Sequence, residues 1–197
     1  MDGVDAVAAT LRTGPDMWDL FGFSDGWARR LEEAQFDLGE GPTVDVLTTG
    51  EPISPVRVGA VSRWTIFGRY AEHAGAGMVA SFPLKLGASV LGSLNLYGRR
   101  TISLSRLVCD DAAILAGFIA SAVAEHAGAW GTAAVTMVAH HEVQAACGVI
   151  AARQHLTITD ALAVLRAHAF ASDQSLRQVA SDLVAGRIYL DEPDDDG

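Results

Sequence analysis

The sequence contains only two cysteines, Cys109 and Cys147, and no secretory signal pattern. A disulfide framework is therefore not expected, and both thiols should stay reduced in the cytoplasm. Long apolar runs are also missing, since the longest one, residues 112–124, is shorter than the roughly 20 residues that span a bilayer. This run predicts a buried helix and no membrane association. Repeats and low-complexity segments are absent, as is typical of a globular protein.

Positive charge is scarce, because 14 lysines and arginines stand against 24 acids, giving a formal net charge of -10. A chain with this balance does not coat nucleic acid non-specifically. The distribution leaves a local site open, however. Residues 131–197 contain four arginines and nine acids, and five of these acids lie in the tail 191–197. Without the tail, this part of the chain is balanced in charge.

The motifs of common catalytic and metal sites are absent as well. There is no G-x-x-x-x-G-K-[ST] loop, and no serine lies in a G-x-S-x-G context. Residues 75–80 have the spacing of a dinucleotide fingerprint, but they precede a predicted strand instead of following one. His141 and Glu142 lack the second histidine of H-E-x-x-H, because Ala145 stands there. We therefore expect no enzyme activity, no cofactor and no metal site.

Hydrophobic periodicity and turn residues predict a strand-rich N-terminal part. Strands are expected at residues 4–11 and 17–23, helices at 26–38 and 42–49, an extended edge segment at 52–58, and a helical or irregular segment at 64–73. Residues 78–86 and 88–97 should pair as a β-hairpin, because Gly87-Ala88 fits a two-residue turn. A long helix at 104–125 should carry Leu107, Ile114 and Phe118 on one side. This order indicates an α+β fold with an antiparallel sheet.

Three stretches of this part resemble the GAF domain, a sensor module. They are LEEAQFDLGEGP at 31–42, FPL at 82–84 and LGSLNLY at 91–97. The resemblance covers residues 1–128 and implies a GAF-like fold with a ligand or signal to sense. Two features depart from the family pattern. Thr43 stands where such domains often have cysteine, and the helix that usually precedes the first strand is missing.

Five residues are candidates for binding a small molecule between the sheet and its helices: Trp64, Phe67, Tyr70, Phe82 and Asn95. Apolar walls with a few polar groups are typical of such pockets. The alternative is that the aromatic residues simply fill the core. The resemblance implies varied ligands, and no residue in the sequence selects one of them.

Residues 138–190 contain three amphipathic helical patterns joined by short polar segments. The first ends near His155, the second begins with the capping pair Thr157 and Asp160, and the third ends near Gly186. An all-α three-helix bundle is therefore expected at 134–190, followed by the acidic tail. Residues 128–131 either form a hinge before it or continue the preceding helix.

The bundle resembles an ANTAR domain through VQAACGVI at 143–150, Arg153, TDAL at 159–162, LR at 165–166 and VA at 179–180. The resemblance implies binding to RNA stem-loops and prevention of transcription termination. It places the RNA-binding residues at Ala146, Cys147, Gly148, Arg153 and Arg166. Many relatives have a lysine at the position of Cys147, so one phosphate contact is missing there.

Each of these residues has a plainer alternative. For Arg153 and Arg166 the alternative is an ordinary solvated helix surface, whereas arginine also suits phosphate contacts and stacking on unpaired bases. Cys147 is either a redox-sensitive thiol or a small buried side chain.

The two resemblances together imply an RNA-binding antitermination regulator that works as a homodimer, reads paired stem-loops and has a small-molecule sensor. The alternative is a ligand-binding sensor or protein-interaction module whose bundle no longer binds RNA.

Overall fold

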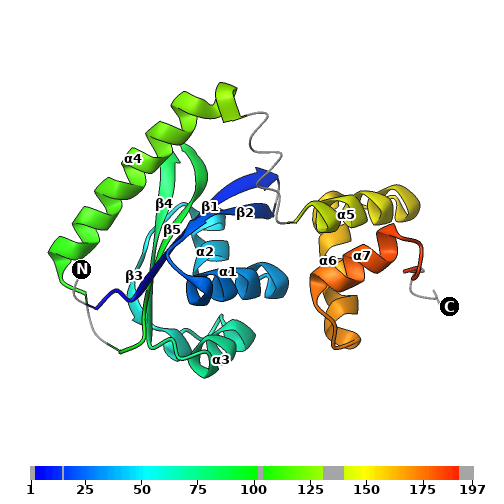
Figure 1. The fold of residues 1–197 in the computed structure, drawn as a ribbon, viewed down its shortest axis with the longest axis horizontal. Coiled ribbons are helices and arrows are strands. Elements are labelled where there is room, and N and C mark those ends of the chain that lie inside the picture. The colour runs from blue at the N-terminus through cyan, green and yellow to red at the C-terminus, as the bar shows by residue number, and fades with distance from the viewer. Residues whose placement is uncertain (1–2, 15, 102–103, 131–139, 191–197) are drawn as a thin grey trace. The chain divides into compact units, whose positions relative to one another are not determined.

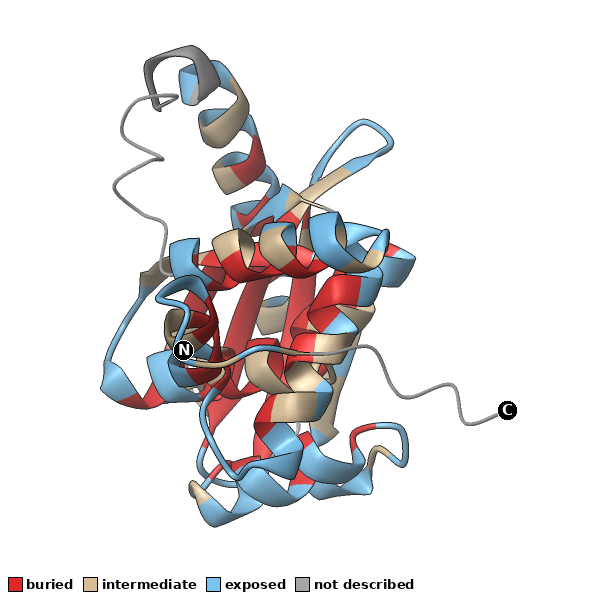
Figure 2. Ribbon diagram, turned by 90° about the vertical axis from the view of Figure 1, so that its right-hand side faces the viewer, coloured by how far each residue is buried: buried red, intermediate tan, exposed pale blue. Residues whose placement is uncertain are grey.

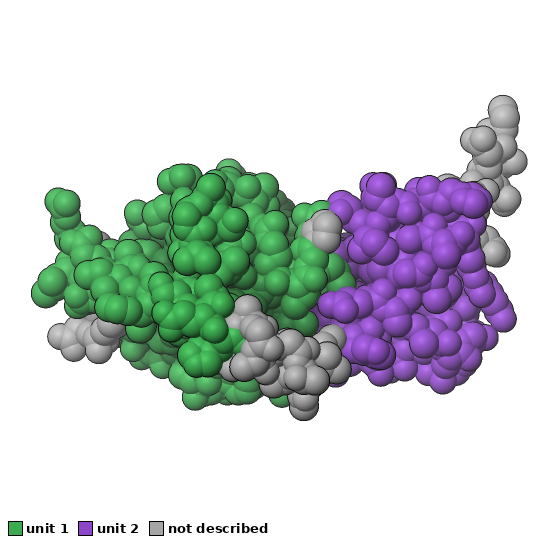
Figure 3. All heavy atoms as spheres, turned by 90° about the horizontal axis from the view of Figure 1, so that it is seen from above, with its two compact units in different colours: residues 1–137 green, residues 138–197 purple. Residues whose placement is uncertain are grey.

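The computed structural model describes residues 3–14, 16–101, 104–130 and 140–190, with residues 127–130 described by their backbone alone. The chain divides into two compact units, Met1–Met137 and Val138–Gly197 (Figure 3). Each unit is described by itself. The acidic tail and most of the segment between the two predicted domains lie outside the described residues.

The first unit is organised around one antiparallel sheet with the strand order β2-β1-β5-β4-β3 (Figure 1). Its strands are β1 (Ala6–Gly14), β2 (Met17–Phe23), β3 (Ile53–Arg57), β4 (Met78–Leu86) and β5 (Ser89–Gly98). β3 lies at an edge, as predicted, because proline cannot donate a ladder hydrogen bond in a central strand. The antiparallel sheet of the predicted α+β fold is therefore confirmed.

The β4-β5 hairpin forms at the predicted place. Leu86 pairs with Ser89, so Gly87 and Ala88 make the turn, and Gly87 has a φ of 60°. This left-handed conformation is easy for glycine and unfavourable for most other residues. The hairpin sets the alternation of β5, which places Ser93, Asn95 and Tyr97 on the opposite sheet face from Leu94 and Leu96.

Helices α1 (Gly26–Leu38) and α2 (Pro42–Thr49) cover one face of the sheet, and α3 (Thr65–His73) packs against α1. A short 3-10 turn, η1 (Val58–Ala60), precedes α3. Asp25 caps α1 by accepting hydrogen bonds from the backbone N–H groups of Trp27 and Ala28, both at 2.9 Å. Both helices end at glycines in the left-handed conformation, Gly39 and Gly50.

The sheet separates two hydrophobic cores. In Figure 2 the buried residues, in red, lie along the strands of the sheet. On the α1 face, Trp27, Leu31, Trp64 and Phe67 pack together. On the other face, the core contains side chains of β4, β5 and the long helix α4 (Arg106–Trp130), among them Phe82.

The expectation that residues 112–124 form a buried helix is wrong. Among the α4 side chains that the structure describes, residues 106–126, only Ala112, Ala116 and Ala120 are fully buried, and Leu107 and Phe118 are exposed. Small alanines face the sheet, and they allow the helix to approach it closely. Residues 106–126 are also long and apolar enough, by length and composition alone, to cross a membrane, and few of them are buried.

The second unit contains α5 (His141–Gln154), α6 (Ile158–Ala171) and α7 (Leu176–Val184), which pack on one another. Most residues of the predicted apolar stripes are buried, including Val143, Ile150 and Leu162, whereas Ile158 and Val184 at the ends of their helices are exposed. The predicted cap of the second helix is present, because the hydroxyl of Thr157 accepts from the backbone N–H of Asp160 at 3.1 Å. Each of the three predicted helices therefore forms in this unit.

Candidate functional site

A group of hydrogen-bonded polar side chains lies between the sheet and helices α1 and α2, inside the first unit. We call it the polar cluster. All of its members are buried, with at most 2% of their surface exposed. They come from α1, α2 and β5 and are Glu32, Gln35, Thr43, Ser93, Asn95 and Tyr97.

The carboxylate of Glu32 is the centre of the cluster and accepts four hydrogen bonds. One oxygen, Oε1, accepts from the phenol of Tyr97 at 2.6 Å and from the amide of Asn95 at 2.7 Å. The other oxygen accepts from the hydroxyl of Thr43 at 2.9 Å and from the amide of Gln35 at 3.2 Å. An ionised carboxylate only accepts hydrogen bonds, so this arrangement matches the charged form.

The same carboxylate is nevertheless hard to ionise. Burial raises the pKa of Glu32 to about 7, although the hydrogen bonds from Tyr97, Thr43 and Asn95 favour the charged form and lower it. Burial and the nearby Glu32 carboxylate also raise the pKa of Tyr97. The pKa of Glu32 is thus set by its burial and by hydrogen bonds from a phenol, a hydroxyl and an amide, all of which are neutral. Its charge is therefore held by hydrogen bonds from neutral groups.

The local sequence explains how these groups meet. Glu32 and Gln35 are three residues apart on α1, so both face the sheet. Gly41 ends the turn after α1 at a φ of 134°, and a side chain at this position would collide with Gln35. The oxygen of Gln35 accepts from the backbone N–H of Thr43 at 2.7 Å, which fixes the start of α2. The alternation along β5 then supplies the remaining members.

The polar cluster is closed in this structure. Within the described part of the chain, every buried side-chain nitrogen and oxygen has a hydrogen-bond partner. A small polar ligand would therefore have to replace the present hydrogen bonds when it enters. The chemistry available at the site is hydrogen bonding and uptake or release of one proton by Glu32.

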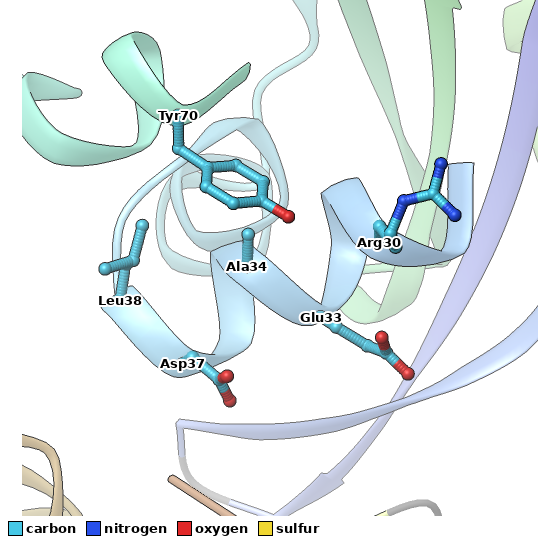
Figure 4. Close-up of a pocket in the computed structure, with 6 residues that line it drawn as sticks. All are labelled: Arg30, Glu33, Ala34, Asp37, Leu38 and Tyr70. Atoms are coloured by element: carbon cyan, nitrogen blue, oxygen red, sulfur yellow. The ribbon is translucent and has the colours of Figure 1, made fainter. Parts of the chain in front are cut away.

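A separate open groove of about 370 Å³ lies on the outer side of α1, between α1 and α3 (Figure 4). The ring of Tyr70 projects from α3 over Ala34 of α1. The groove is lined by Arg30, Glu33, Ala34, Asp37, Leu38 and Tyr70.

The structure does not bring the five predicted ligand-binding residues together. Trp64 and Phe67 are buried in the core on the α1 face, whereas Phe82 belongs to the core on the opposite face. Asn95 is in the polar cluster, and Tyr70 lines the outer groove. Ligand binding by these residues stays a prediction, but they do not form one pocket.

Sequence reasoning missed most of the polar cluster, although two patterns pointed to it. Ser93, Asn95 and Tyr97 alternate along a predicted strand, which assigns them to one face. Glu32 and Gln35 have the three-residue spacing that puts side chains on one helix face. Nothing in the sequence, however, shows that these two faces meet.

The predicted RNA-binding residues of the second unit fall in two places. Ala146 and Cys147 are fully buried, and only Gly148 of that run is exposed. Arg166 of α6 lies near Cys147, where its positive charge lowers the pKa of the thiol. Burial is the stronger effect and raises the pKa of Cys147 to about 11, so this thiol stays protonated near neutral pH.

Arg153 lies on another side of α5, about 140° around the helix from Gly148. Its guanidinium stacks on the ring of Tyr189 at 5.3 Å from the ring centre. Tyr189 is held there in part by the next residue, because the carbonyl of Leu190 accepts a hydrogen bond from Gln154 at 2.8 Å. This exposed aromatic residue beside Arg153 had no sequence pattern that identified it.

Gly148 has an unusual environment for a glycine inside a helix. A Cβ atom at this position would meet no other atom within 4 Å, so packing in the described residues does not require glycine. Glycine in a helix interior is less stable than alanine by roughly 0.5–1 kcal/mol. The absence of a side chain therefore leaves an open approach to the backbone of α5.

Comparisons with known proteins support the fold of the first unit. No protein-family model and no curated protein matches the sequence. A solved domain described as part of a two-component sensor histidine kinase from Sinorhizobium meliloti 1021 is similar with a TM-score of 0.53 and 14% identity, covering 66% of this chain and 85% of that one.

Two further structures are similar at a lower level. The GAF domain region of a membrane protein from Geobacter sulfurreducens PCA has a TM-score of 0.48 and 15% identity, covering 61% of this chain and 82% of that one. A type II free methionine-R-sulfoxide reductase from Thermoplasma acidophilum has a TM-score of 0.48 and 11% identity, covering 62% and 81%. At these identities the comparisons concern the fold alone, and the sensor histidine kinase domain, at a TM-score of 0.53, shares the fold of the first unit.

Proposed function

We propose that the protein is a cytoplasmic regulator with a GAF-like sensor unit and an ANTAR-like three-helix bundle that binds RNA stem-loops and prevents transcription termination. The observation that carries the RNA-binding part is the surface of α5. On one side of α5 a solvent-exposed arginine stacks on an exposed tyrosine, and on another side lies a helical glycine that packing in the described residues does not require. Unpaired bases stack on aromatic and guanidinium planes, and phosphates pair with arginine.

Charge supports the same proposal. Asp182 is engaged by Arg187 at 2.6 Å, so Arg187 is not available for phosphate without losing that pair. Arg153 instead stacks on a neutral ring, so within the described part of the chain its N–H donors are not taken up by an acid. A homodimer would present two such surfaces and offset the small number of cations in each copy.

The sensor part of the proposal rests on the polar cluster. A GAF-like fold with a hydrogen-bonded carboxyl group between its sheet and helices has a place where a small polar ligand, or a proton, can change the packing of α1 and α2. The ligand is a small molecule that can both donate and accept hydrogen bonds, because the members of the cluster do both.

The test is a titration of the full chain with a tandem stem-loop RNA at 50, 100 and 200 mM salt, a range over which phosphate contacts change the affinity strongly. The logarithm of the binding constant should fall linearly with the logarithm of the salt concentration. Arg153→Ala and Arg166→Ala should each reduce the affinity and lower the salt slope by about one unit if they contact phosphate. Arg177→Ala, which removes the same charge from α7, is the matched control.

A second function is favoured by one observation, the buried and neutral Cys147 where many ANTAR domains have a cation. In that case the chain is a ligand-binding sensor or protein-interaction module without RNA binding. The same titration separates the two, because this second candidate predicts no binding of any stem-loop RNA at 50 mM salt.

A further inference from the structure

Helix α4 covers the sheet with its smallest side chains. Ala112, Ala116 and Ala120 follow each other at four-residue spacing, are at most 1% exposed, and pack in the core with β4 and β5. Residues at this spacing lie on one face of a helix. The larger apolar residues of α4 must therefore project elsewhere.

Four large apolar side chains project away from the sheet. Leu107 is 70% exposed, Ile114 59%, Leu115 44% and Phe118 68%. We call them the outer face of α4. With roughly 150–200 Å² for each side chain, they expose on the order of 400 Å² of apolar surface per copy. Apolar patches of this size on a monomer are often functional contact sites.

The outer face has the shape that a second helix needs. Gly117 lies beside Phe118, and a Cβ atom at Gly117 would meet nothing within 4 Å. Ile114, Gly117, Phe118 and Ser121 are spaced i, i+3, i+4 and i+7, which are the four corners of a hole for a knob from a facing helix. A glycine corner leaves room for a branched knob such as isoleucine.

Polar residues on this face determine the direction of the pairing. The positions 107, 111, 114, 118, 121 and 125 repeat at alternating spacings of four and three, and they carry Leu, Asp, Ile, Phe, Ser and Glu. A parallel pair would place Asp111 against Asp111 and Glu125 against Glu125. Both residues are exposed and acidic, so this arrangement is repulsive.

An antiparallel pair removes these repulsions. With Ile114 opposite Phe118 of the second copy, Asp111 lies opposite the hydroxyl of Ser121. Glu125 then comes next to Arg106, whose side chain is 94% exposed and only 3.8 Å from its helical neighbour Asp110. We propose that two copies of this chain pair through the outer faces of α4 in antiparallel orientation, with Ile114 of each copy in the hole of the other and Phe118 forming one corner of that hole.

This pairing rests on the homodimer of the proposed function and gives it an interface, but it does not require RNA binding. Two outer faces together bury on the order of 800 Å², which is below the roughly 1,200–2,000 Å² of stable interfaces. The dimer should therefore be weak and depend on protein concentration. Sedimentation equilibrium of the full chain from about 5 to 500 µM measures this directly.

The first comparison uses Phe118→Glu, which should leave the protein monomeric at every concentration while the circular dichroism spectrum stays unchanged. Leu86→Glu is the matched control, because Leu86 is an exposed apolar residue of the same unit outside α4. It should dimerise as the wild type does. A wild type that stays monomeric, or a Phe118→Glu variant that still dimerises, overturns the proposal. A monomer that instead sediments with phosphatidylcholine-phosphatidylglycerol vesicles also overturns it and assigns the face to a membrane.

The second comparison tests the orientation by charge exchange. Arg106→Glu and Glu125→Arg should each raise the dimer dissociation constant on the order of fivefold, and the double variant should restore it. An acid at the N-terminus of α4 and a base near its C-terminus both suit the helix dipole, so neither change should unfold the helix. The antiparallel arrangement is overturned if Phe118→Glu abolishes the dimer but the double variant Arg106→Glu/Glu125→Arg does not restore the wild-type dissociation constant. The RNA titration remains an independent test of the second unit.

Discussion

The raised pKa of Glu32 makes the stability of the first unit depend on pH. Below pH 4.5, the carboxyl is protonated in both the folded and the unfolded chain. Between pH 4.5 and about 7, the folded chain still holds this proton, whereas the unfolded chain has released it. Folding therefore binds a proton in this range, and the free energy of unfolding falls as the pH rises.

The size of the effect follows from the same values. A pKa raised from 4.5 to about 7 corresponds to about 3 kcal/mol at 1.36 kcal/mol per unit, so stability should decrease by this order between pH 4.5 and pH 8. The contribution is fully present below pH 4.5 and is lost as the pH rises through 7. Tyr97 and Cys147 have raised pKa values and titrate above this range, so they do not obscure it.

Urea unfolding followed by tryptophan fluorescence at pH 5, 6, 7 and 8 measures this dependence. All four tryptophans lie within residues 1–130, so the signal reports the first unit. Glu32→Gln cannot ionise and should lose the dependence, whereas Glu33→Gln, a partly exposed neighbour on the same helix, should keep it. The reasoning is refuted if wild-type stability is constant or rises from pH 5 to pH 8, or if Glu32→Gln keeps the wild-type slope.

Three other predictions concern single residues. Asp25→Ala should lower the free energy of unfolding of the first unit by about 1 kcal/mol, measured by urea unfolding, because α1 loses its N-terminal cap; an unchanged midpoint would contradict this role. Gly148→Ala should stabilise the second unit by about 0.5–1 kcal/mol, seen as a higher melting temperature, and should weaken the RNA complex. Unchanged RNA affinity would show that no partner approaches α5 there. Iodoacetamide at pH 7.5 should modify Cys147 only after unfolding, because burial raises the pKa of its thiol to about 11. Mass spectrometry measures the modification. Rapid modification of Cys147 in the native protein would contradict a buried thiol.

The sequence predicted those parts of the fold that depend on neighbouring residues. The cap formed by Thr157 and Asp160, the end of the third helix near Gly186, and the two-residue turn at Gly87 all act within a few positions of themselves. Their physical causes are local backbone geometry and local hydrogen bonds. The helix and strand bounds were therefore close to the observed ones.

The two features that matter most for function could not be predicted in this way. The polar cluster joins α1 to β5 across more than sixty positions of sequence, as in the hydrogen bond between Tyr97 and Glu32. For α4, periodicity showed which residues share a face but not which face meets the sheet. Large apolar residues normally face the core. Here the alanines do so, because they allow the helix to approach β4 closely.

The RNA-binding proposal also depends on information that the sequence supplied only in part. Arg153, Arg166 and Gly148 were identified by resemblance to a family, whereas Tyr189 came from the structure. A loop base that stacks on Tyr189 would compete with Arg153 for the same ring. The affinity of the complex therefore includes the loss of the contact between Arg153 and Tyr189.

The most direct test of the central claim is selection from a pool of tandem stem-loop RNAs with randomised loops, using the full chain at 50 mM salt. The account predicts enrichment of particular loops, loss of enrichment in the Arg153→Ala/Arg166→Ala variant, and retention in Arg177→Ala. No enrichment over the starting pool, or equal enrichment by the double variant, would contradict the proposal that this chain is an RNA-binding regulator.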